Sequence, residues 1–222
     1  MQSPFRKTVG VTMILAPLLG IVSAIASPPL ESGTGAQLAE ITRHSDRWYV
    51  YALFITASSW LLVPAVVGIT GMLSERAPRL GLLGGALGLL GTLIAVGDST
   101  TELMYWQMGA PSADRAQMIA LSDRYDNATG SSLIFTVGGL AVIVGLAILA
   151  VALWRTRLAP AWAAACVPAG AIANIAGFAQ SSNLVVLVSN VILLAGLGWI
   201  GSRLLAAHVE HRLQPQPQPT TT

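Results

Sequence analysis

Six long apolar stretches account for most of this chain, and no Asp, Glu, Lys or Arg occurs through the middle of any of them. A helix needs about 20 apolar residues to cross a bilayer, and lipid offers the backbone no partners outside a helix. The strands of a membrane barrel need only about ten alternating residues, so these stretches are too long for one. The sequence therefore predicts an all-α integral membrane bundle of six transmembrane helices, near Thr8–Ala26, Val50–Leu73, Leu80–Leu103, Ser131–Trp154, Pro160–Ala179 and Leu184–Leu205.

Composition agrees with a membrane protein and excludes several other classes. Charged residues make up 10% of the chain, whereas a soluble domain has roughly 25%. The net charge of +2 is too small to predict nucleic-acid binding. Cys166 is the only cysteine, which excludes a disulfide framework and a multi-cysteine metal site. No zinc-binding or phosphate-binding motif occurs either, so we expect neither a metal nor a cofactor.

The positive charges are unevenly divided between the two sides of a six-span bundle. Because Lys and Arg collect in cytoplasmic loops, the richer side is predicted to be cytoplasmic. This places both termini in the cytoplasm and the protein in the cell membrane. The richer side has Arg6, Lys7, Arg76, Arg79, Arg155, Arg157, Arg203 and Arg212, and the other side has Arg43, Arg47, Arg115 and Arg124.

The first apolar stretch has a second interpretation. It follows a basic start and ends in Ala24-Ile25-Ala26, which fits a signal-peptidase site, and cleavage there would leave five spans. Against cleavage, the apolar region is longer than the usual run of roughly 7–15 residues. An internal repeat also requires this helix.

That repeat pairs "HSDRWYVY", from His44, with "LSDRYDNA", from Leu121. A weaker match lays the stretch from Ala77 on the stretch from Ala159. Together they predict three repeated helix hairpins, about 8–73, 80–154 and 160–205, in one transmembrane domain of residues 1–206. Residues 207–222 are rich in Pro and Gln and are predicted to form a disordered cytoplasmic tail.

The first two outer connections are long enough to fold locally. Each is predicted to hold a short amphipathic helix, within "GAQLAEITRHSDRWY" and "PSADRAQMIALSDRY". Ser112 is the predicted N-cap of the second.

Asp98 and Glu102 are the candidate catalytic residues. Asp98 follows eighteen uncharged residues, which span about 27 Å as a helix and carry it to the outer edge of the hydrocarbon. Glu102 lies about one turn further out. One interpretation is a helix leaving the lipid, with Tyr105 and Trp106 marking the interface. The other is a carboxylate pair that acts as general acid and base.

The two copies of the repeated motif bring further polar and aromatic residues to the same side. If the hairpins pack side by side, these residues surround one outward-facing vestibule that binds a lipid or an apolar small molecule. The alternative is structural, with Asp and Arg bracing the loops and the rings anchoring the interface. The candidate binding residues are Asp46, Arg47, Trp48, Tyr105, Trp106, Asp123, Arg124 and Tyr125.

Two other functions remain open. The first is an isoprenoid-processing membrane enzyme, in which the carboxylates transfer protons and aromatic faces stabilise a cationic intermediate. The second is an interaction subunit, because Gly84 and Gly88 have the spacing by which membrane helices pack closely on a partner.

The stretches "RAPRLGLLGG" and "ALWRTRLAPAWAAACVPAGAI", with the outer "SDRW" motif, resemble a broad group of small actinobacterial polytopic membrane proteins of unknown function. The resemblance covers most of residues 8–206 and implies no catalytic residue. Membrane-bound terpene cyclases are similar in type, as small helical bundles with acidic residues among aromatics. Their Trp-Glu motif is not found here, and "TELMYWQ" is only a loose counterpart.

Overall fold

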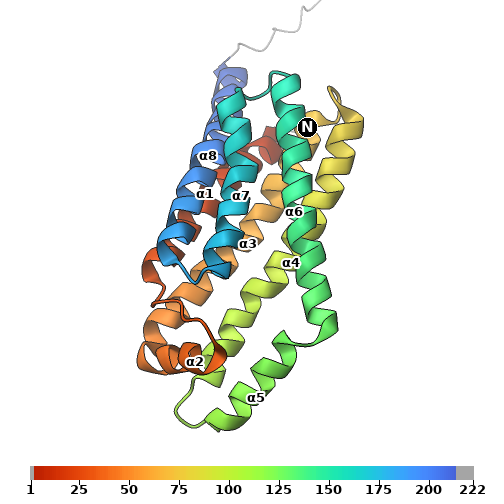
Figure 1. Cartoon of the computed structure of the whole chain (residues 1–222). Helices are drawn as coiled ribbons and strands as arrows, with labels where there is room; N and C mark the ends of the chain where they lie inside the picture. The colour runs from red at the N-terminus through yellow and green to blue at the C-terminus, as the bar shows by residue number, and fades with distance from the viewer. Residues whose placement is uncertain (1–2, 214–222) are drawn as a thin grey trace, which may run out of the picture.

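The computed structural model describes residues 3–213 and the side chains of residues 5–206. These residues form helices and no strand. Six helices are long and apolar enough to cross a membrane, which confirms the predicted number of spans. The long helices are α1 (Ser3–Ala26), α3 (Ser45–Leu73), α4 (Pro78–Met108), α6 (Thr129–Arg155), α7 (Ala161–Ala179) and α8 (Asn183–Leu213), and the short ones are α2 (Thr34–Arg43) and α5 (Arg115–Asp126) (Figure 1).

The six long helices pack in a closed ring. Each contacts its neighbours in the order α1, α3, α4, α6, α7 and α8, and α8 returns to α1. The contact between α6 and α7 is the least extensive in this ring. Helices α2 and α5 lie at one end, which we call the cap end, and α1 begins and α8 ends at the opposite end (Figure 1). We call that opposite end the basic end, after the arginines of the α3–α4 and α6–α7 turns.

Helix α1 is part of the core. Val9, Met13 and Ala16 are fully buried, and the helix packs against both α3 and α8. Cleavage after Ala26 would therefore remove a helix that packs against two other spans and would lose the close van der Waals contacts that hold membrane helices together.

Glycines let α4 and α6 approach within backbone contact. A Cβ atom on Gly145 would lie 2.2 Å from the amide nitrogen of Gly88, and one on Gly84 would lie 3.0 Å from the carbonyl oxygen of Gly145. The face of α4 that we expected to bind another protein is thus occupied by α6 of the same chain. The Gly84/Gly88 spacing is a packing signal, as expected, but its partner is internal.

Helix α2 covers the cap end. Its buried Leu38 and Ile41 pack on Trp48 and Tyr51 of α3 and on Met108 of α4. This small core explains why α4 continues to Met108, five residues beyond the predicted end at Leu103. α8 likewise extends to Leu213, past the predicted end at Leu205, and residues 214–222 of the predicted tail lie outside the described residues.

The N-cap of α5 is Asp114, so the prediction of Ser112 was wrong. The Asp114 carboxylate accepts hydrogen bonds from the backbone amides of Ala116 and Gln117, at 3.0 and 3.2 Å. A carboxylate satisfies these free amides and also interacts favourably with the helix dipole.

The two copies of the repeated motif occupy different places. Asp46 and Arg47 lie in the first turn of α3, a span, whereas Asp123 and Arg124 lie near the end of the short helix α5. The side chain of Asn127 donates a hydrogen bond to the Asp123 carbonyl and ends α5 before α6 begins. The internal repeat therefore stays a prediction based on the sequence.

Candidate functional site

Three cavities follow one another from the cap end into the ring, and we call them together the cavity tract. The cap cavity, of about 300 Å³, lies under α2. The middle cavity, of about 370 Å³, lies between α3, α4, α6 and α7. The inner cavity, of about 130 Å³, is enclosed by α3, α4, α6, α7 and α8. Glu102 and Phe178 line both of the first two, and Asn174 and Ile175 line both of the last two.

The lining changes from polar to apolar along the tract. The cap cavity has three carboxylates, from Glu31, Glu102 and Asp126, and the middle cavity adds Asp98. None of the described residues that line either of them is a Lys, Arg or His. Of the described residues that line the inner cavity, only Thr92 and Asn174 are polar, and every other one is aliphatic.

Glu102 is held at the junction of the cap and middle cavities. Its carboxylate accepts a hydrogen bond from the Tyr51 hydroxyl at 3.3 Å, and its backbone carbonyl accepts one from the Trp48 indole at 3.2 Å. Both donors come from α3 and are only 2% exposed. Their rings meet edge to face, with centroids 5.0 Å apart. Glu102 thus has a fixed position, set by two neighbouring rings.

Asp98 lies one turn deeper on α4 and lines the middle cavity. Among the described residues, no side chain forms a hydrogen bond or ion pair with its carboxylate. The side chain is exposed rather than packed. Asp98 and Glu102 therefore share one cavity, but only Glu102 is fixed by a neighbouring side chain.

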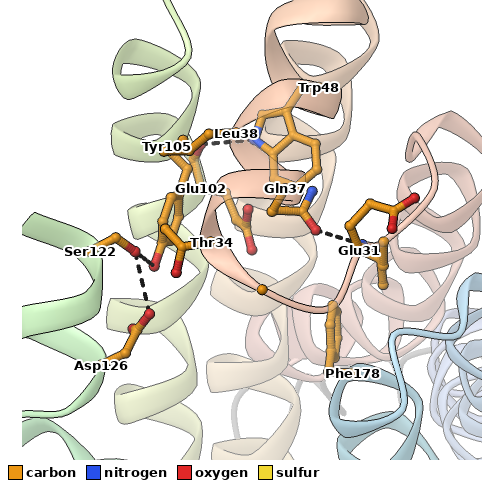
Figure 2. A pocket seen from close by; sticks show the side chains of 12 residues that line it. Glu31, Thr34, Gln37, Leu38, Trp48, Glu102, Tyr105, Ser122, Asp126 and Phe178 are labelled. Carbon is orange, nitrogen blue, oxygen red and sulfur yellow. Dashed lines mark hydrogen bonds between the residues drawn. The ribbon is translucent and has the colours of Figure 1, made fainter. Parts of the chain in front are cut away.

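A short hydrogen-bond chain closes the α5 side of the cap cavity (Figure 2). The Ser122 hydroxyl donates to Asp126 at 3.3 Å and lies 3.2 Å from the Tyr105 hydroxyl. Because a serine hydroxyl has one hydrogen, Tyr105 is the donor to Ser122. On the opposite wall, the backbone amide of Glu31 donates to the Gln37 side chain at 2.8 Å.

Four of the ten predicted site residues line these cavities, namely Asp98, Glu102, Trp48 and Tyr105. Arg47 instead donates to the carbonyls of Ala26 and Ser27 at the end of α1, at 3.3 and 3.2 Å. Asp46 is exposed in the first turn of α3.

The other four predicted residues also lie outside these cavity walls, and three of them connect the outer elements. Asp123 accepts a hydrogen bond from Thr34 at 2.6 Å, which ties α5 to the start of α2. Trp106 donates to Ser45 at 2.8 Å. Arg124 donates to a carbonyl of its own helix, and the ring of Tyr125 lies against Phe135. These contacts fit the bracing alternative.

Sequence reasoning missed most of the lining residues, among them Tyr51, Asp126, Asn174 and Phe178. Asn174 had a detectable signal, because an amide in the middle of an apolar span must find a polar partner. It donates to Ser189 of α8 at 3.0 Å. Tyr51 follows Trp48 by three residues and so shares its helix face. Phe178 is an apolar residue near the end of an apolar span and had no such signal.

No metal centre forms within the described residues, where no group of three His, Cys, Asp or Glu side chains could hold an ion. The side chains of His208 and His211 lie outside that part of the chain.

No protein-family model matches the chain, and no curated protein or solved structure gives a significant match. The resemblance to small actinobacterial membrane proteins therefore stays a prediction. The six long apolar helices make this chain a multi-pass membrane protein.

Proposed function

We propose that the cavity tract binds one amphiphilic molecule, with its apolar tail in the inner and middle cavities and its head group in the cap cavity. The continuous change from a carboxylate-lined cavity to an aliphatic one carries this proposal. Binding sites for small molecules have this character, with a mostly apolar wall and a few placed polar groups.

The charges of the lining define the head group. The described lining of the cap and middle cavities has four carboxylates and no cation, so an anionic head such as a phosphate would be repelled. A cationic head, or a neutral head that donates hydrogen bonds, would be attracted. The aromatic rings of Trp48, Tyr105 and Phe178 favour a cation further.

The orientation belongs to the same proposal. The basic end has the arginines of the α3–α4 and α6–α7 turns, which the positive-inside rule assigns to the cytoplasm. The cap cavity then faces the outside of the cell membrane, and a ligand enters from that side or from the outer leaflet.

The test fills the middle cavity without disturbing the ring. A Cβ atom on Gly139 of α6 would have only Ile175 nearby, at 3.9 Å, so Gly139→Leu extends into free space between α6 and α7. We expect this variant to keep at most about one tenth of the ligand that copurifies with the unmodified protein. A tenfold loss of affinity corresponds to about 1.4 kcal/mol of binding free energy. The measurement is native mass spectrometry of the full chain purified in a mild detergent, followed by identification of the released compounds.

Gly97→Leu is the matched control. A Cβ atom on Gly97 of α4 would meet nothing within 4 Å, and this residue lines none of the three cavities. The control should keep the ligand. Equal ligand in both variants, or no ligand in the unmodified protein, would contradict the proposal.

Enzymatic turnover of an isoprenoid is the second candidate function, because Asp98 and Glu102 line the same cavity as the rings of Tyr51, Phe135 and Phe178. One carboxylic acid would donate a proton to an alkene of the substrate, and the carbon cation would close a ring by a new carbon–carbon bond. The other carboxylate would then remove a proton, so the product is an isomer of the substrate. Aromatic faces stabilise such a cation.

Amide substitutions test this second function. Asp98→Asn and Glu102→Gln should each lower the conversion of a linear polyprenyl alcohol to its cyclic isomer by about 100-fold or more, the usual contribution of general acid–base catalysis. Chromatography resolves the two isomers, which have the same mass. Asp46→Asn makes the same chemical change outside the cavities and should leave the rate unchanged. An unchanged rate in both site variants would exclude the enzymatic role and leave ligand binding intact.

A further inference from the structure

A surface hollow at the basic end is lined by arginine and tryptophan, and none of its described lining residues is an acid. It lies where α6 turns into α7 and against α8, and none of its lining residues lines the cavity tract. We call it the Arg–Trp hollow, and its lining residues are Trp154, Arg155, Arg157, Trp199 and the turn residues 159–161.

Among the described side chains, the arginines around the hollow have no ionic partner. Arg155, Arg157 and Arg203 are exposed. The two ion pairs among the described side chains both involve Glu40, at the cap end. Of the acids with described side chains, only Glu75 belongs to the basic end, and it lies in the α3–α4 turn. The hollow thus has an excess of positive charge that no described side chain neutralises.

Tryptophan rings frame these charges. Trp154 and Trp162 are 57% and 53% exposed. Trp162 meets Trp199 edge to face, with centroids 6.2 Å apart, and the Arg203 guanidinium lies 5.3 Å from the centroid of Trp199. Exposed tryptophan next to arginine is typical of the boundary between hydrocarbon and head groups.

The backbone places Arg157 where glycine is the usual residue. At the end of α6, the amide of Leu158 donates to the Leu153 carbonyl and that of Arg157 donates to the Trp154 carbonyl, both at 3.0 Å. This is the Schellman pattern, whose residue after the C-cap has a positive φ. Arg157 occupies that position with a φ of 58°. A side chain there costs conformational energy, so its presence calls for a reason.

We propose that the Arg–Trp hollow binds the phosphate of an anionic phospholipid in the leaflet at the basic end. Arginine forms charge-assisted hydrogen bonds with phosphate, and clustered basic residues at this level of a membrane protein attract anionic lipids. The exposed rings, and Val151 one turn earlier on α6, offer an apolar surface to the acyl chains. This surface favours a lipid over a free phosphate. The inference does not depend on the proposed ligand of the cavity tract.

The test compares two lipids with the same acyl chains. The purified full chain is titrated with dioleoyl phosphatidylglycerol or dioleoyl phosphatidylcholine, and bound lipid is counted by native mass spectrometry. The unmodified protein should prefer phosphatidylglycerol. The double variant Arg155→Gln/Arg157→Gly should lose about fivefold in affinity for each arginine removed. Glycine suits the backbone at 157, so the variant should fold as well as the unmodified protein.

Arg76→Gln/Arg79→Gln is the matched control. It removes two exposed arginines from the same end, in the α3–α4 turn and the first turn of α4. It should keep the preference for phosphatidylglycerol. An equal loss in the control would show a general surface charge and overturn the proposal. Equal binding of both lipids by the unmodified protein, or displacement of phosphatidylglycerol by millimolar inorganic phosphate, would also overturn it.

Discussion

Replacing Trp48 with alanine is expected to lower the free energy of unfolding by about 3–5 kcal/mol, the usual cost of truncating a buried aromatic side chain. Trp48 is 2% exposed and packs with Leu38 and Ile41 of α2. Its indole also donates to the Glu102 carbonyl of α4. The substitution therefore removes contacts between three helices at once.

Trp60→Ala provides the control for this prediction. Trp60 lies on the same helix, but it is 59% exposed. Its truncation should change the free energy of unfolding by about 0.5 kcal/mol or less. Reversible unfolding in mixtures of a mild detergent and dodecyl sulfate measures both variants. Similar losses for Trp48→Ala and Trp60→Ala would show that α2 does not depend on the small core beneath it.

Gly145→Ala is expected to destabilise the ring by about 1–3 kcal/mol, because overpacked interiors force the backbone to shift. The new methyl group would meet the backbone of Gly88 and Leu87 at 2.2 to 2.8 Å, and neither can rotate away. The α4–α6 contact must therefore open to admit it.

Gly139→Ala, six residues earlier on α6, should instead stabilise the protein. Its methyl group would make an ordinary contact with Ile175 at 3.9 Å. Alanine is favoured over glycine in a helix by up to about 1 kcal/mol, so this variant should unfold at a higher temperature than the unmodified protein. Thermal unfolding in the same detergent ranks the three proteins. A Gly145→Ala protein as stable as the Gly139→Ala protein would be incompatible with backbone contact between α4 and α6.

The spans could be predicted from the sequence because lipid imposes a single requirement on each of them. Their ends could not, because protein contacts decide how far a helix continues. α4 extends to Met108 since Met108 is buried beneath α2. The predicted span begins at Val50, but α3 begins at Ser45, because His44 has the non-helical dihedral angles φ −125° and ψ 43°.

The candidate site was predictable where a charge or a large ring interrupts an apolar pattern. Asp98, Glu102, Trp48 and Tyr105 have that signal, and all four line the cavity tract. Phe178 does not, because its position on the cavity wall depends on the rotation of α7 in the ring. A search of the spans for charged residues alone also misses polar amides such as Asn174.

The repeated Asp-Arg motif shows the opposite failure. Its two copies match in sequence, but Arg47 caps the end of α1 while Arg124 bonds to its own helix. Short motifs of this kind report local hydrogen-bonding needs, which different elements meet in different ways.

Because the ring closes between α8 and α1, the order of the spans is cyclic. Every long helix has a neighbour on each side in the ring, so no span is peripheral, although the chain has two ends. Both ends of the described chain also lie at the basic end (Figure 1). A circular permutant with the ends joined by a flexible linker and a new opening in the α3–α4 turn would keep every pair of neighbouring spans. We therefore expect the architecture to depend on which helices are neighbours and not on which of them is made first.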